Sequence, residues 1–158
     1  MKCRGTLSAD LATYLALSLV VVITLAPLAY KMVNHTLTSA RIHAYVDEIV
    51  FNSRDHYALS VLRTRCLAQS DLSMSALGMA SDLQAGVSYH VAYQQSHTAH
   101  DRPLGIAVTV TLDDAKLQNQ AAWLSADEVR NHTLTFYRPL NYQLPDWQQI
   151  NTNTGCIR

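Results

Sequence analysis

Residues 11–30 read LATYLALSLVVVITLAPLAY, a run of twenty residues without one formally charged side chain. Asp10 precedes the run and Lys31 follows it. A helix of this length rises roughly 30 Å, which is about the thickness of the hydrocarbon core of a bilayer. The run therefore predicts a helix that crosses a membrane. The acid at its edge needs a separate reason, because a carboxylate in hydrocarbon costs several kcal/mol unless it is paired.

Two general kinds of membrane segment explain this run only in part. A secretory signal peptide has a basic start, a short apolar core and a small-x-small cleavage site. Cleavage near Ala29 would put Pro27 three residues before the cut and would leave Asp10 inside the signal. A signal-anchor helix, with Lys2 and Arg4 holding the N-terminus in the cytoplasm, fits the charges better. It leaves the acid unexplained.

The N-terminus also resembles that of type IV pilins and of the related pseudopilins of type II secretion systems. In that family a short basic leader ends in Gly and is removed by a dedicated prepilin peptidase. A cut after Gly5 makes Thr6 the first mature residue and Asp10 the fifth, where the family carries an acid. Pro27 becomes the twenty-second, where many pilins have Pro, and an aromatic follows at Tyr30. One register thus places the Gly, the acid and the Pro together.

The chain departs from the family pattern in two ways. The family usually begins Phe-Thr-Leu-Ile-Glu after cleavage, whereas residues 6–10 read Thr-Leu-Ser-Ala-Asp, with the same charge on a side chain one methylene shorter. The apolar helix also carries more hydroxyls than that of a major pilin. These are Ser8, Thr13, Ser18 and Thr24. Both departures favour a minor or divergent member of the family over an abundant filament subunit.

The resemblance gives roles to individual residues. It implies cleavage between Gly5 and Thr6 and N-methylation of the new Thr6 amine. Asp10 would pair with that amine on a neighbouring chain and so fix the axial register of adjacent helices. The alternative is that Asp10 lies at the headgroup level as a helix N-terminal acid favoured by the macrodipole. Pro27 removes one helical hydrogen bond, which predicts a kink under either alternative.

The same resemblance implies a structural protein and no enzyme. The chain would sit in the bacterial inner membrane as a single-pass protein with its head in the periplasm, and would then enter a pilus or pseudopilus. Implied partners are other pilin subunits through the N-terminal helix, the prepilin peptidase and an inner-membrane assembly platform. Adhesion, motility, DNA uptake and secretion share this stalk chemistry. The alternative is an uncleaved single-pass membrane protein whose periplasmic domain binds a ligand or scaffolds another complex.

The helix is expected to continue past the membrane. Residues 33–65 contain neither Pro nor Gly, and apolar or small side chains recur at three- and four-residue spacing. They are Ile42, Val46, Ile49, Val50, Ser53, Tyr57, Val61 and Leu62. We therefore predict four parts: a leader over residues 1–5, a transmembrane and assembly helix over 6–31, its amphipathic continuation over 32–65, and a head over 66–158. A break into two helices at residues 34–36 is the alternative.

In the head, the spacing of apolar side chains changes from the three to four residues of a helix to the two residues of a strand. Residues 87–93, 105–112 and 134–137 alternate apolar and polar side chains and predict about three antiparallel strands. Residues 115–130 read as a helix, with Ser125 and Glu128 in capping-box spacing. The segment 67–84 and the tail after Pro139 read as mainly irregular. The predicted fold class is α+β, a long N-terminal helix packed on a small antiparallel sheet.

Cysteine usage indicates one crosslink. Cys3 would leave with the leader, so the mature chain keeps Cys66 and Cys156. A single pair outside the inner membrane is expected to oxidise. A bridge closing so long a loop would stabilise the fold by on the order of 4 kcal/mol in chain-entropy models. The alternative is two unrelated thiols.

The sequence predicts no catalytic site, metal site or cofactor. The formal net charge is zero and there is no basic run, so nucleic acid is not expected as a partner. His97, His100 and Asp101 form the one tight cluster of metal-ligating types, but a zinc site wants three or four oriented ligands. We interpret the cluster as a solvated turn. Aromatic side chains of the last third are expected to pack in the core or to form a binding surface: Trp123, Tyr137, Tyr142 and Trp147.

Overall fold

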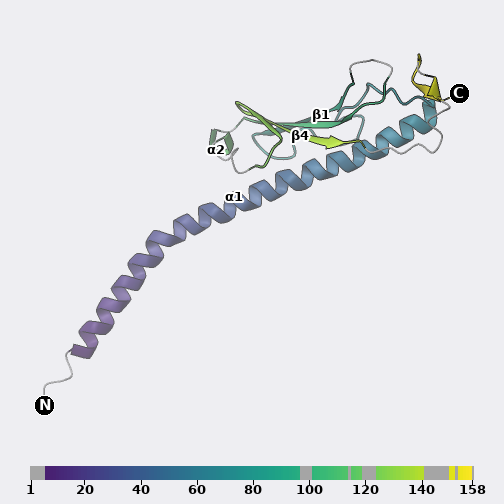
Figure 1. The fold of residues 1–158 in the computed structure, drawn as a ribbon. Coiled ribbons are helices and arrows are strands. Elements are labelled where there is room, and N and C mark those ends of the chain that lie inside the picture. Colours follow the sequence, from purple (N-terminus) through teal and green to yellow (C-terminus); the bar gives the residue numbers. More distant parts are fainter. Residues whose placement is uncertain are drawn as a thin grey trace. The chain divides into compact units, whose positions relative to one another are not determined.

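The computed structural model describes residues 6–96, 101–113, 115–118, 124–140, 150–151 and 153–157. The chain divides into two compact units, Met1–Ala40 and Arg41–Arg158. The first element, α1, is a single helix over Thr6–Thr64 (Figure 1). It continues without interruption through Pro27 and through residues 34–36, so the alternative of two separate helices is wrong.

The head contains a four-stranded antiparallel sheet. Its strands are β1 (Val87–Gln94), β2 (Gly105–Leu112), β3 (Glu128–Arg130) and β4 (Thr133–Pro139), in the order β1-β2-β4-β3. The three strands predicted from alternation are confirmed. Their register places Val91 opposite Val108 and Val108 opposite Phe136, so apolar residues share one face across the sheet.

The predicted helix over residues 115–130 is wrong in its second half. Helix α2 covers only Ala115–Gln118, and residues 119–123 lie outside the described part. Glu128–Arg130 instead form β3, which turns into β4 through Asn131 and His132. Asn131 has a φ of 51°, a left-handed conformation that Asn tolerates better than most residues. This short hairpin adds the fourth strand.

The expected capping box at Ser125 and Glu128 is also wrong. The Glu128 carboxylate accepts a hydrogen bond from Arg130 Nε at 2.5 Å and another from the Tyr137 hydroxyl at 3.0 Å. These two bonds lower the pKa of Glu128, that from Tyr137 having the larger effect. Glu128 therefore belongs to the exposed surface of the β3–β4 hairpin and caps no helix.

One face of α1 buries against the sheet in the unit Arg41–Arg158. The predicted stripe is confirmed at seven positions that are at most 5% exposed: Ile42, Val46, Ile49, Val50, Ser53, Tyr57 and Val61. Leu62 was expected on the same stripe but is 72% exposed. A shift of one residue from Val61 rotates a helical side chain by about 100°, and this takes Leu62 off the buried face.

Aromatic pairs join the helix to the sheet. Tyr45 meets Tyr89 edge to face with ring centroids 4.7 Å apart, and Tyr57 meets Tyr93 at 5.8 Å. The hydroxyls of the two helix tyrosines are hydrogen-bonded as well, since Tyr45 donates to the Ala80 carbonyl at 2.6 Å and Tyr57 to the Leu67 carbonyl at 2.9 Å. Burial raises the pKa of Tyr89 to about 12, so its hydroxyl remains protonated at a higher pH than that of an exposed tyrosine.

The C-terminal segment forms regular structure where we expected none. Strands β5 (Ile150–Asn151) and β6 (Cys156–Ile157) pair antiparallel, and β6 also lies beside the residues that follow α1. Ile157 N donates to the Arg65 carbonyl at 2.7 Å, and Leu67 N donates to the Gly155 carbonyl at 2.8 Å. The helix ends just before this contact, where Arg65 adopts a left-handed φ of 56°.

Replacing Phe136 with Ala should lower the free energy of unfolding by about 3–5 kcal/mol, because its ring is fully buried between α1 and the sheet. Leu62→Ala is the matched control, and its effect should stay within about 0.5 kcal/mol. Urea unfolding of the full chain in detergent micelles, followed by near-UV circular dichroism, measures both. Equal losses in the two variants would contradict the packing described here.

Candidate functional site

The first candidate site is the N-terminal stretch of α1. Within the described residues α1 is the one helix long and apolar enough to cross a membrane, by length and composition. A core helix of a soluble protein can meet the same criterion, but its apolar side chains would be covered. Here Leu15 is 62% exposed and Ile23 is 63% exposed, and the most apolar window has no buried residue. So much uncovered apolar surface is typical of a segment that contacts lipid or other helices.

The hydroxyls in this segment bond to their own helix. Thr13 Oγ1 donates to the Asp10 carbonyl at 2.7 Å, Ser18 Oγ to the Leu15 carbonyl at 2.9 Å, and Thr24 Oγ1 to the Val20 carbonyl at 2.9 Å. A hydroxyl satisfied in this way needs no water, which lowers the cost of placing it in hydrocarbon. These side chains are therefore compatible with a membrane segment despite their polarity.

Asp10 lies in the first turns of α1 with an exposed side chain. Its carboxylate makes no ion pair with any residue that the structure describes. Thr6 begins the helix four residues earlier, so the two residues lie on the same side of α1, one turn apart. Gly5 lies outside the described residues, as does the side chain of Thr6. Cleavage and methylation at these two positions remain predictions.

Cys66 and Cys156 are joined as the sequence predicted. Their sulfur atoms lie 2.01 Å apart, and the residues pair in an antiparallel bridge across a sequence separation of 90. The bond connects the segment after α1 to β6. It therefore reinforces covalently the two main-chain hydrogen bonds that flank it, those between Arg65 and Ile157 and between Leu67 and Gly155.

Among the remaining predicted positions, those within the described part of the chain form no second site. His97 and His100 lie outside the described residues, as do Trp123, Tyr142 and Trp147. The described residues contain no group of three His, Cys, Asp or Glu side chains that could hold a metal ion. Tyr137 is 37% exposed, and its hydroxyl donates to Glu128. It belongs to the surface of the hairpin and not to the core.

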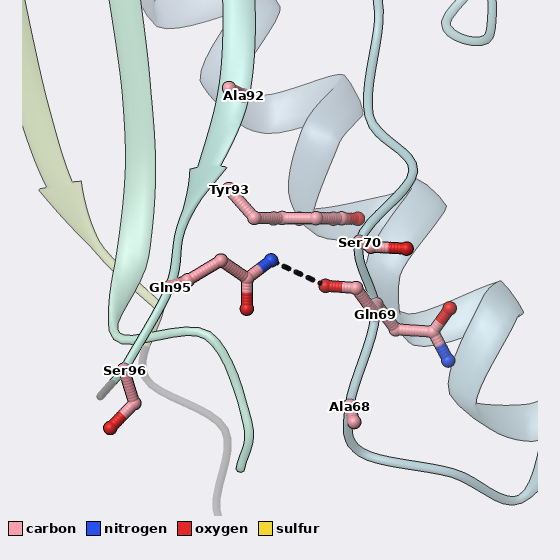
Figure 2. A pocket seen from close by; sticks show the side chains of 7 residues that line it. All are labelled: Ala68, Gln69, Ser70, Ala92, Tyr93, Gln95 and Ser96. Carbon is pink, nitrogen blue, oxygen red and sulfur yellow. Dashed lines mark hydrogen bonds between the residues drawn. The ribbon is translucent and has the colours of Figure 1, made fainter. Parts of the chain in front are cut away.

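The structure also contains a groove that sequence reasoning missed (Figure 2). Its volume is about 540 Å³, and it lies between the end of β1 and the extended chain after Cys66. Gln95 Nε2 reaches across and donates to the Gln69 carbonyl at 2.9 Å. The lining residues are Ala68, Gln69, Ser70, Ala92, Tyr93, Gln95 and Ser96. None of them carries a formal charge.

Tyr93 forms the inner end of this groove but offers little surface to it. The side chain is 6% exposed, and its hydroxyl lies 3.3 Å from His56 Nδ1 on α1. Burial raises the pKa of Tyr93 to about 12, so the phenol stays neutral at a higher pH than an exposed one. A ligand in the groove would meet more apolar than polar surface, and the polar groups would come from uncharged residues.

A scan against protein-family models and searches of curated proteins and of solved structures found no match to this chain. The resemblance to pilins thus remains a prediction that depends on the residues between Gly5 and Tyr30.

Removing the disulfide should destabilise the head. Cys156→Ala is expected to lower the free energy of unfolding by about 2–5 kcal/mol, because it frees a loop of 90 residues in the unfolded chain. Cys66→Ala should have the same effect, and the double variant should add little to either, as expected for two residues that act through one bond. Urea unfolding measures the three variants. Additive losses would show that each cysteine acts independently.

Proposed function

We propose that this chain is a minor pilin or pseudopilin, a structural subunit that is processed after Gly5 and enters a filament through α1. The observation that carries the proposal is the combination of an uncovered apolar helix with a single carboxylate at its start. A simple anchor needs the apolar helix, but the one advantage it gains from Asp10 is the weak attraction of an acid to a helix N-terminus.

The apolar surface of α1 can be covered either in a membrane or in a filament. A filament subunit occupies first the membrane and then the filament. In the membrane, lipid covers the side chains at positions such as Leu15 and Ile23. In a filament, the same side chains pack against copies of the same helix. Transfer between the two costs little, because lipid tails and leucine side chains are about equally apolar.

Asp10 provides a register for that packing. Cleavage after Gly5 would create an amine at Thr6, and the amine of one chain can pair with the Asp10 carboxylate of a neighbour. Because the two groups are separated by one helical turn, such a pair offsets parallel neighbours by roughly 6 Å along the axis. A buried carboxylate left unpaired is costly, so this register is favoured over others.

The disulfide and the charges near the N-terminus support a periplasmic location of the head. Lys2 and Arg4 precede the apolar run, which favours a cytoplasmic N-terminus. A head on the opposite side would be in the periplasm, where a bond such as Cys66–Cys156 persists. The proposed partners are accordingly a prepilin peptidase, an inner-membrane platform and other pilin subunits.

The second candidate is an uncleaved single-pass protein whose head binds a ligand. The groove beside β1 is the specific observation in its favour, because it offers uncharged hydrogen-bonding groups that the core does not use. The two candidates differ in the state of the N-terminus.

Intact mass and N-terminal sequencing of the protein recovered from membranes test the class. A chain beginning at Thr6 is expected, with the mass of one added methyl group on the amine. Gly5→Leu should yield only the unprocessed precursor, because the leader that the resemblance implies ends in Gly. Recovery of a wild-type chain that still carries residues 1–5 would favour the uncleaved anchor.

Asp10→Ala should be cleaved normally but recovered from sheared filaments at about a tenth of the wild-type level or less, given a lost pairing energy above 1.4 kcal/mol. Asp10→Glu retains the charge and should enter filaments. Immunoblots of sheared and membrane fractions compare the two. Equal incorporation of both variants would remove the register role from Asp10.

A further inference from the structure

We draw no further inference here: the strongest candidate, the exposed apolar surface that Phe51, Leu59 and Leu62 form on the outer side of α1 in the unit Arg41–Arg158, carries none because nothing in the structure shows what covers it.

Discussion

The burial of one helix face against one sheet face is the constraint on which the rest of the head depends. Between residues 42 and 61, every position of the predicted stripe is at most 5% exposed, and the facing strands contribute fully buried Val91, Val108 and Phe136. Apart from the tyrosine hydroxyls, the buried polar side chain found among the described residues is Ser53, which donates to the Ile49 carbonyl within the helix. The described residues of this interface bury no formal charge, so apolar burial and shape supply most of its stability, together with the hydrogen bonds of Tyr45 and Tyr57.

The helix and three strands could be predicted because their patterns are long and periodic. Strands β1 and β2 alternate over eight residues each, and a register error of one residue would expose their entire apolar face. Strand β3 has only three residues, and its middle residue, Val129, is 52% exposed. It is held by pairing with β4, a tertiary effect that no local pattern records. The spacing of Ser125 and Glu128 pointed to a helix that these contacts override.

The candidate sites also differ in how far the sequence alone could locate them. The positions of Asp10 and Pro27, together with the cysteine pair, follow from residue identity and counting, so the sequence alone could locate them. The groove beside β1 arises where two segments distant in sequence meet, and one of them, residues 67–84, has no regular period. Gln69 and Gln95 are unremarkable surface residues until folding places them 2.9 Å apart.

Gly105 shows how closely the central strands approach each other. A Cβ at this position would lie 2.7 Å from the Arg138 carbonyl oxygen, so no other residue fits without a shift of the main chain of β4. The start of β2 can therefore lie directly against the end of β4, where Pro139 stands opposite Gly105 and donates no hydrogen bond.

The bond between Cys66 and Cys156 also determines how the molecule carries a pulling force. The covalent loop it closes contains the four-stranded sheet and β5, while α1 lies on one side of the bond and Ile157 on the other. Tension applied between the helix and the C-terminal residues would pass through a single sulfur–sulfur linkage. The four strands of the main sheet lie inside the loop, outside the covalent path of that load, and they could remain paired under a force that would otherwise peel them apart in sequence.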